Sequence, residues 1–443
     1  TRMKSDSDDF YDDLVNRTLF EIGQPTFYSE PSCKAAMTYR GMLNEQDYSI
    51  NSCMGEVIVG KELADMWGCC VNMNLALELS VNKGKPFSGE LPESLNIYFK
   101  DVIPMEPTSM EIIKAQYYRY TQCIVRYVTD LNKKRSAWVA WNRPNPVLSM
   151  LLDDCIEYGR DRAHASIHSM GMEAKEWLKI PDEQFEAVRS GRGVKYHNVT
   201  VLAQGFADAG DSLEVIKKLV FEEKKYTLED LIQATIYNFE GSKRNLEIFS
   251  AVKNCPKYAD GSDDTDDMAA FVLNALADAA ENCYHGNVRY LPTCHTIDSN
   301  VQFGRCVYAN LDGRKDGEAF GKNAGPVMQV IKNTPTDLMT SALHLPQYRF
   351  SGGVPIDIYI PANILDDEEG RAKVKGLLKV YLENGGMQVQ VNSVSLDLLK
   401  KAYENPEEYP NVIVRKGGFS IYFTDMLKEV QKDMIERFEK EIS

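Results

Sequence analysis

Asn411-Val-Ile-Val-Arg-Lys-Gly-Gly-Phe-Ser-Ile-Tyr-Phe-Thr-Asp425 is the stretch on which the interpretation of the whole sequence depends. Its β-branched run, residues 412–414, predicts a buried strand that ends at Arg415-Lys416. The chain then breaks into Gly417-Gly418 and continues at once with aromatic and apolar residues. A solvated turn would carry Asn, Asp or Ser at this place. The stretch therefore predicts either an ordinary β-turn before the last helix or a glycine loop that enters the protein interior.

The composition indicates a globular protein of one large or two to three ordinary domains, because 44% of the 443 residues are hydrophobic. A net charge of −15 argues against binding to nucleic acid and against binding to an anionic membrane surface. No apolar run approaches the ~20 residues that span a bilayer, and residues 1–9 lack the apolar region of a signal peptide. The ten cysteines are scattered and form no Cys-x-x-Cys, so we expect free thiols in a reducing cytoplasm.

Helical segments alternate with short β-branched segments, which predicts an α/β fold with parallel strands. In the last hundred residues we expect strands at 355–360 and 387–393, and helices at 369–383, 395–403 and 424–440. The polar segment 163–192 is expected to be an excursion from the core. Upstream helices are expected at residues 10–20, 32–43, 62–82, 108–133, 147–158, 211–220, 227–237 and 268–281.

Residues 48–60 combine apolar and small side chains, which predicts a strand that enters a tight loop at 52–55 and returns into apolar structure. Cys53 lies at the tip of that loop. A single free cysteine is most often a small buried hydrophobe, so Cys53 by itself identifies no reactive site.

Common catalytic and metal-binding motifs are missing from the sequence: there is no Gly-x-Gly-x-x-Gly, Walker loop, His-Glu-x-x-His or Gly-x-Ser-x-Gly. His164 and His168 could share a helix face as metal ligands, but no third ligand is near in sequence and we expect a solvated surface. Four further candidates fit no common zinc spacing and are expected to serve packing: Cys283, His285, Cys294 and His295. The sequence therefore predicts no metal site.

Arg415-Lys-Gly-Gly-Phe-Ser-Ile421 resembles Arg-Val-x-Gly-Tyr-x-Ala, the glycyl-radical signature of the pyruvate formate-lyase-type glycyl radical enzymes. Leu311-Asp-Gly-Arg-Lys-Asp-Gly-Glu318 is similar to the family's Pro-Asp-Gly-Arg-Lys-x-Gly-Glu. Further matches follow the family's order along nearly the whole chain, at residues 23–26, 48–60, 154–157, 211–221, 238–241, 385–392 and 405–410.

The resemblance implies that Gly418 stores a radical and that Cys53 carries the reactive thiyl, with Gly417 as the alternative storage site. Glycine suits storage because its α-carbon radical can flatten between two amides with no side chain in the way. The thiol must be neutral before it gives up hydrogen, so a buried apolar setting suits Cys53. Residues 421–423 are expected to be buried and to keep water and oxygen away. No bound cofactor is implied, because a radical S-adenosylmethionine activating enzyme would install the radical after the glycine loop flips out.

The sequence departs from the family pattern around the cysteine. Gly55 stands where many dehydratases, decarboxylases and carbon–nitrogen or carbon–sulfur lyases carry a Glu, and we hypothesise that Glu56 substitutes as the base. Pyruvate formate-lyase has two adjacent cysteines, whereas Ser52-Cys53 offers one, which disfavours acyl transfer. The branch that adds hydrocarbons to fumarate also lacks the Glu and has Met after its cysteine, as here. The signature itself departs where Val, Tyr and Ala are replaced by Lys416, Phe419 and Ile421.

The implied reaction is that of a lyase, in which the thiyl abstracts hydrogen from a small substrate and thereby triggers bond cleavage. Ser52 is expected to contact substrate, and so is His197, because Lys195-Tyr-His-Asn198 rejoins the family pattern near where some members place substrate groups. The alternatives are a fumarate-adding synthase, a formate acyltransferase and a non-catalytic spare-part subunit. A spare part needs only the glycine loop, so the presence of both Cys53 and Gly418 favours a catalytic role.

The family fold is a ten-stranded α/β barrel made of two five-stranded parallel halves set antiparallel, and members are usually nearly twice as long as this chain. The resemblance therefore implies a second half-barrel at residues 1–325, with 163–192 as an insertion, followed by a glycyl radical domain at 326–443. A half-barrel alone would expose strand edges and an apolar interior. We expect a second polypeptide that supplies the N-terminal half, in a cytoplasmic, oxygen-sensitive oligomer such as a dimer of heterodimers.

Overall fold

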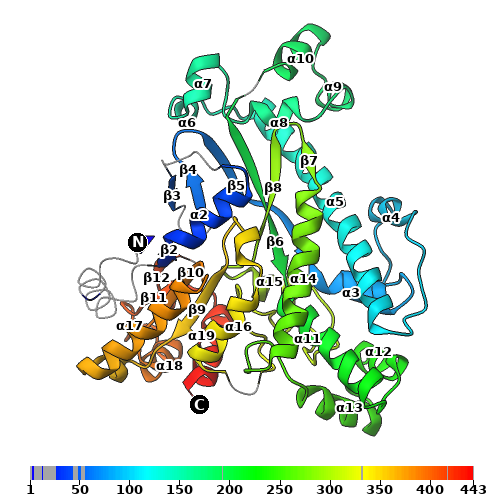
Figure 1. Ribbon diagram of the computed structural model, residues 1–443, viewed down its shortest axis with the longest axis vertical. Coiled ribbons are helices and arrows are strands. Elements are labelled where there is room, and N and C mark those ends of the chain that lie inside the picture. Colours follow the sequence, from blue (N-terminus) through cyan, green and yellow to red (C-terminus); the bar gives the residue numbers. More distant parts are fainter. Residues whose placement is uncertain are drawn as a thin grey trace.

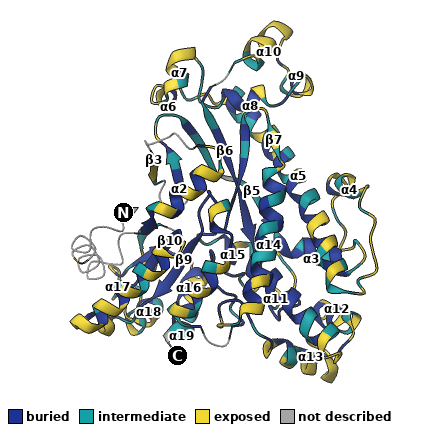
Figure 2. Ribbon diagram, in the orientation of Figure 1, coloured by how far each residue is buried: buried dark blue, intermediate teal, exposed yellow. Residues whose placement is uncertain are grey.

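A computed structural model of the chain describes residues 2–3, 12, 26–42, 48–50, 55–191, 193–330, 333–416 and 418–442. The predicted site residues Ser52 and Cys53 lie outside the described residues. Within these residues, two four-stranded sheets form the centre of the molecule, and helices surround them (Figure 1). The strands at the centre are mostly buried, whereas the outer helices carry the exposed residues (Figure 2).

The first sheet has the strand order β5-β6-β8-β7. Strands β5, β6 and β8 run parallel, and β7 pairs antiparallel with β8. All residues of β6 after its first are buried, as expected for a central parallel strand that is covered on both faces. The strands span Glu62–Asn72 (β5), Tyr196–Gln204 (β6), Tyr284–His285 (β7) and Val288–Thr293 (β8).

The second sheet has the strand order β1-β2-β10-β9. Strands β9 and β10 are parallel, whereas β2 pairs antiparallel with β10. The strands span Arg2–Met3 (β1), Phe27–Ser29 (β2), Pro355–Tyr359 (β9) and Gln388–Asn392 (β10). The expected strands at 355–360 and 387–393 are thus confirmed to within a residue at each end, and the prediction of an α/β fold with parallel strands holds.

The two sheets meet where β8 ends and the approach to β9 begins. Gly352 N–H donates to the Pro292 carbonyl over 3.2 Å, and Cys294 N–H donates to the Gly353 carbonyl over 3.1 Å. A side chain at Gly352 would place its Cβ 2.8 Å from Thr293 Cβ, so only glycine allows this approach. The strands of the described residues form no closed barrel, and the ten-stranded barrel with its two halves stays a prediction.

Four helices pack together on one side of the first sheet and form its main core (Figure 1). They include the 33-residue helix α5 and the Ala-rich helix α14, which contact each other along their lengths. The four span Met73–Val81 (α3), Met110–Asn142 (α5), Phe206–Ile216 (α11) and Asp263–Glu281 (α14). Smaller elements at the edge of this layer span Glu93–Phe99 (α4), Lys217–Glu222 (the π-helix η1), Leu228–Ile236 (α12) and Lys243–Lys253 (α13).

The prediction of one helix over residues 62–82 is wrong, because the segment divides into β5 and α3. The apolar spacing that suggested a helix belongs to a strand that pairs with β6 along most of its length. The helix begins only after Asn72, whose side chain accepts a hydrogen bond from Asn74 N–H. Short apolar runs do not distinguish a buried strand from a buried helix, which explains the error.

The segment 163–192 forms a small helical unit at the top of Figure 1. Its helices span His164–His168 (α8), Glu173–Leu178 (α9) and Asp182–Arg189 (α10), next to Pro146–Ser149 (α6) and Asp153–Tyr158 (α7). A separate apolar cluster, which includes Phe185 and Ala137 of α5, holds the unit to the rest of the molecule. The expectation of a solvated surface is wrong for His164, which is buried, and holds for His168.

The C-terminal part of the chain packs around its own apolar cluster, which includes Val414, Phe423, Met434 and Phe438. The expected helices at 369–383 and 395–403 are confirmed within a residue, whereas the last helix begins four residues later than expected. The elements here are Ser299–Gly304 (α15), Pro335–His344 (α16), Glu368–Glu383 (α17), Leu396–Glu404 (α18), Ile413–Lys416 (β11), Phe419–Tyr422 (β12) and Lys428–Ile442 (α19), with 3-10 turns at Gln347–Arg349, Ala362–Leu365 and Phe423–Asp425.

Candidate active site

The glycine stretch forms a tight antiparallel hairpin of β11 and β12. Lys416 and Phe419 are the last pair of the hairpin, and Gly418 lies in the turn between them. Gly418 has a φ of +85°, in the left-handed region that glycine adopts without strain. The sequence predicted the first strand and the turn but missed β12.

Both peptide groups of Gly418 are held by buried polar side chains. Gly418 N–H donates to Gln390 Oε1 of β10 over 2.9 Å, and Arg415 Nη2 donates to the Gly418 carbonyl over 2.6 Å. Arg415 itself is fixed by Thr26 Oγ1 at 2.7 Å and, through its backbone N–H, by Asn392 Oδ1 at 2.9 Å. The glycine is therefore positioned from both sides by the second sheet.

Lys416, which replaces the Val of the family signature, has a definite partner. Its Nζ lies 3.0 Å from Asp298 Oδ2, and the Lys416 side chain is only 9% exposed. A nearly buried ion pair between the hairpin and the residue before α15 accounts for the charged residue at this position.

The expected apolar cover of the glycine turn is only partly present. Phe423 is fully buried and Ile421 is half-buried, but Tyr422 is 45% exposed. Phe419, beside the turn, is also 42% exposed. The prediction that residues 421–423 are all buried is therefore wrong for Tyr422 and only partly right for Ile421.

The cysteine loop is carried by a second hairpin, Tyr48–Ile50 (β3) and Glu56–Ile58 (β4). Ile50 pairs with Glu56, so the strands on either side of the predicted loop are antiparallel neighbours, whereas residues 51–54 of the loop lie outside the described residues. Gly55, at the returning end, has a φ of +88°, and a Cβ there would lie 2.7 Å from the Ser351 carbonyl and 3.1 Å from Gly353 N. The described end of the loop therefore rests on the segment that joins the two sheets.

The described ends of the two hairpins contact the segment before β9 and the neighbouring strand β10. The cysteine hairpin rests on Gly353, and the glycine hairpin is bound by Gln390, which pairs with Asp357 of β9. Gly353 and Asp357 are four residues apart, which is roughly 13 Å along an extended chain.

Glu56 is a buried carboxyl group at the stem of the cysteine hairpin. It is 2% exposed, and this burial raises its pKa to about 7, against the opposing effect of the Arg40 guanidinium. Arg40 Nη1 lies 3.5 Å from Glu56 Oε1, and Arg40 Nη2 lies 3.1 Å from Glu62 Oε1. Glu62 also accepts hydrogen bonds from Ile58 N–H at 2.9 Å and from Asn198 Nδ2 at 2.5 Å. A carboxyl group with a pKa near neutrality can act as a general base.

His197 does not face Glu56, Arg40 and Glu62 but contacts a residue of α8. It is buried in β6, and its Nδ1 lies 3.4 Å from Ser166 Oγ of α8. Burial lowers its pKa to about 4, so the imidazole is neutral at physiological pH. The next residue along β6, Asn198, is the one that contacts Glu62. The structure therefore places Arg40 beside Glu56 and joins Glu62 and Asn198 to the same cluster. The sequence pattern at 195–198 included Asn198 without giving it a role, and it did not indicate Arg40 or Glu62.

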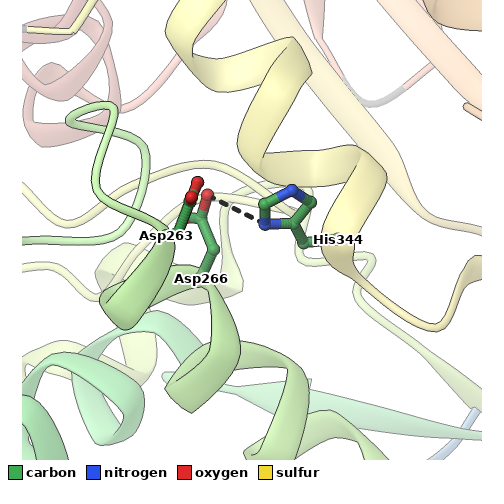
Figure 3. A group of neighbouring side chains, drawn as sticks. All are labelled: Asp263, Asp266 and His344. Carbon is green, nitrogen blue, oxygen red and sulfur yellow. Dashed lines mark ion pairs between the residues drawn. The ribbon is translucent and has the colours of Figure 1, made fainter.

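Asp263, Asp266 and His344 form a separate group at the junction of α14 and α16 (Figure 3). His344 Nδ1 lies 3.4 Å from Asp266 Oδ2, and burial raises the pKa of Asp266 to about 6. The carboxylates stand in the first turn of α14 and the histidine in the last turn of α16, which are the helix ends that favour these charges. Helix-end electrostatics explains this group.

Arg314, from the Asp-Gly-Arg-Lys stretch, organises the loop between α15 and the second sheet. Its side chain is fully buried and donates to the Glu318 carbonyl at 2.6 Å and to the Val307 carbonyl at 3.2 Å. It also lies 3.9 Å from Asp208 of α11. Further acceptors of its guanidinium are the Gly304, Tyr308 and Lys315 carbonyls and Asn310 Oδ1.

Replacement of Arg314 by Met is expected to destabilise the protein by about 3–5 kcal/mol, because buried carbonyls and Asp208 would lose their charged partner. Urea denaturation followed by circular dichroism measures the loss. Lys315→Met is the matched control, because Lys315 makes only a partly exposed ion pair with Glu240, and its loss should cost less than about 1 kcal/mol. Equal losses in the two variants would contradict the structural role of Arg314.

Two family models match the chain. Residues 2–304 match the model described as "Pyruvate formate lyase-like", and residues 320–424 match the one described as "Glycine radical". The second range includes Gly418. In the described residues, no helix is long and apolar enough to cross a membrane.

Several enzymes of known activity are similar to the chain. (2S)-3-sulfopropanediol dehydratase of Klebsiella oxytoca is 26% identical over 437 residues, covering 94% of this chain and 48% of that protein. Isethionate sulfite-lyase of Nitratidesulfovibrio vulgaris is 34% identical over 241 residues, covering 53% of this chain and 28% of that protein. The glycerol-bound B12-independent glycerol dehydratase from Clostridium butyricum has the same fold, with a TM-score of 0.82 at 23% identity, over 98% of this chain and 51% of its own. The chain thus spans at most about half the length of these relatives.

Proposed function

The chain belongs to the pyruvate formate lyase-like family of glycyl radical enzymes, and we propose that it carries the radical centre of a glycyl radical lyase. In this proposal Gly418 stores the radical and Cys53 transfers it to a small substrate. The observation that carries the proposal is the hairpin turn at Gly418, whose two peptide groups are held by Gln390 and Arg415. A radical centred on the α-carbon is stabilised by these flanking amides, and the hydrogen bonds keep them in place.

The proposed radical transfer balances hydrogen atoms at each step. Cys53 S–H gives its hydrogen atom to the Gly418 α-carbon radical, which restores the glycine and leaves a sulfur radical on Cys53. The sulfur radical then takes a hydrogen atom from a substrate C–H bond and becomes a thiol again. After a neighbouring bond has broken, the product radical takes a hydrogen atom back from Cys53 S–H, which re-forms the sulfur radical. Each transfer needs atoms close together. The contacts of the two hairpins with the segment before β9 and with the neighbouring strand β10 support the proposal.

Bond cleavage by elimination is the reaction class that the relatives' names favour, since they include a dehydratase and a sulfite-lyase. An elimination of this kind removes a proton as well as a hydrogen atom, so it needs a base beside the substrate. We propose that Glu56 is this base, because it stands at the stem of the cysteine hairpin and titrates near neutrality. Ser52, next to Cys53, and His197 are retained as proposed substrate contacts.

Replacement of Glu56 by Gln is expected to lower kcat/KM by about 10²- to 10⁴-fold, the range that general bases contribute. The base must be ionised and its pKa is raised to about 7, so the wild-type rate should rise with pH through about 7 and then level off. This rise should be absent in the Gln variant. The control is Glu157→Gln, at an exposed position of α7. Normal turnover by Glu56→Gln would refute the assignment.

We further propose that another half-barrel completes the active site, supplied either by a longer form of this polypeptide or by a second one. The support is that the relatives are about twice as long as this chain. A radical S-adenosylmethionine enzyme is the proposed activator, in an anaerobic cytoplasm, and the division between barrel part and glycyl radical domain is kept at residues 325/326. Anaerobic activation, followed by turnover assays with isethionate, sulfopropanediol and glycerol, tests the proposed reaction class.

A further inference from the structure

The described end of the cysteine loop packs against one peptide group, the one that joins Gly352 to Gly353. A Cβ at Gly55 would lie 3.3 Å from the Gly352 carbonyl carbon and 3.1 Å from the Gly353 nitrogen, the two atoms of this peptide bond. It would also lie 2.7 Å from the Ser351 carbonyl oxygen. The position of this peptide group therefore sets where the returning end of the cysteine loop can lie.

Thr293, the last residue of β8, holds this peptide group through its side chain. Its Oγ1 lies 2.8 Å from the Gly352 carbonyl oxygen and 3.0 Å from the Gly353 carbonyl oxygen, so its one hydrogen is shared between two acceptors. The same Oγ1 accepts a hydrogen bond from His295 N–H at 3.1 Å. The Thr293 side chain is fully buried, so solvent does not compete for these bonds.

The backbone on either side of this peptide group is also bound to the end of β8. Gly352 N–H donates to the Pro292 carbonyl at 3.2 Å, and Cys294 N–H donates to the Gly353 carbonyl at 3.1 Å. Neither bond holds the Gly352 carbonyl, whose described donor is the Thr293 hydroxyl. The orientation of the peptide plane therefore depends on Thr293.

Valine has nearly the shape of threonine, but its methyl group cannot take the place of this hydroxyl. A carbon atom normally stays at least about 3.3 Å from a carbonyl oxygen, and both carbonyl oxygens lie closer than that to Thr293 Oγ1. Valine at this position would remove the hydrogen bond and displace the Gly352 carbonyl by roughly half an ångström. Serine would keep the hydroxyl and lose only the methyl group.

We propose that Thr293 is a positioning residue for the cysteine hairpin, because its hydroxyl fixes the peptide group against which Gly55 packs. That the hairpin carries the reactive Cys53 rests on the proposed function, whereas the support of the hairpin by Thr293 does not. Under the proposed function, a displaced hairpin slows hydrogen-atom transfer through Cys53, since such transfers depend steeply on distance. Storage of the radical is unaffected, because the described contacts of Gly418 do not include Thr293.

Hydrogen–deuterium exchange of the unactivated protein, read by mass spectrometry, tests the support of the hairpin. Thr293→Val should speed exchange of the amides of residues 55–58 by at least about fivefold, which corresponds to the loss of one ordinary hydrogen bond. Thr293→Ser should exchange as the wild type does. The matched control is Thr265→Val, because the buried Thr265 hydroxyl is likewise shared between two carbonyls, those of Lys257 at 3.2 Å and Ser262 at 2.8 Å. It should leave exchange at residues 55–58 unchanged.

Turnover per stored radical tests the consequence in the anaerobically activated protein. Thr293→Val should store as much radical as the wild type, while its kcat per radical falls at least about tenfold and its KM changes little. Thr293→Ser and Thr265→Val should both turn over at the wild-type rate per radical.

Unchanged exchange at residues 55–58 in Thr293→Val would overturn the proposal. Equal losses of turnover per radical in Thr293→Val and Thr265→Val would also overturn it, because a general loss of stability would then account for both. A Thr293→Ser variant that behaves as Thr293→Val does would show that the hydroxyl is not the group that matters. If the wild type stores no radical, the proposed function fails, and the exchange measurement still decides whether Thr293 supports the hairpin.

Discussion

Cys53→Ala is expected to reduce turnover below detection while the protein still accumulates its stored radical after activation. Alanine has no S–H bond, so the stored radical has no route to the substrate, whereas the Gly418 hairpin is unchanged. Turnover assays, with electron paramagnetic resonance to quantify the radical, measure the two properties separately. Cys306→Ala is the matched control, because Cys306 is the exposed cysteine among the described residues and should have no effect.

Measurable turnover by Cys53→Ala would show that another group carries the radical to the substrate. Loss of the radical together with turnover would instead show that the cysteine is needed for activation or folding. Only loss of turnover with the radical retained agrees with the proposed role.

Gly418→Ala is expected to abolish turnover and to remove the site of radical storage. Alanine at a φ of +85° is strained by about 1–2 kcal/mol, and its methyl group prevents the α-carbon from becoming planar without a clash. The strain is small compared with the stability of most domains, so the variant should fold. Turnover after anaerobic activation and a thermal unfolding curve distinguish the chemical effect from the folding effect.

Gly376→Ala is the control for this substitution. Gly376 lies within α17, a Cβ there would contact nothing within 4 Å, and alanine favours a helix by about 1 kcal/mol. This variant should be active and slightly more stable. If Gly418→Ala turned over substrate at the same rate, Gly418 could not be the storage site.

The elements that flank the radical hairpin were predictable because their patterns are local. The strands β9 and β10 are β-branched runs bounded by turn residues, and α17 and α18 follow with amphipathic spacing. The helix expected at residues 227–237 likewise begins at a local signal, the capping box of Thr227 and Asp230. Strand β5 was missed because its apolar residues have a spacing that is also typical of a helix. Its pairing with β6, which the sequence does not show, identifies the segment as a strand.

The glycine turn and the cysteine loop were predictable as local features, but their surroundings were not. Gln390 and Arg415 hold Gly418, and Arg415 is held in turn by Thr26, almost 400 positions away in the sequence. No local sequence pattern predicts such contacts. The pKa of Glu56 depends on its burial and on Arg40, and both are consequences of tertiary packing. The exposure of Tyr422 depends on which side of the folded hairpin faces solvent, and the apolar composition of the stretch does not predict that.

The most direct test of the central claim is the electron paramagnetic resonance spectrum of the anaerobically activated protein. Storage at Gly418 predicts a doublet from its single α-hydrogen, which becomes a singlet when the protein is produced with glycine deuterated at the α-carbon. The doublet should be absent in Gly418→Ala and present in Gly417→Ala. A doublet that persists in Gly418→Ala, or one that does not change on glycine deuteration, would contradict the account.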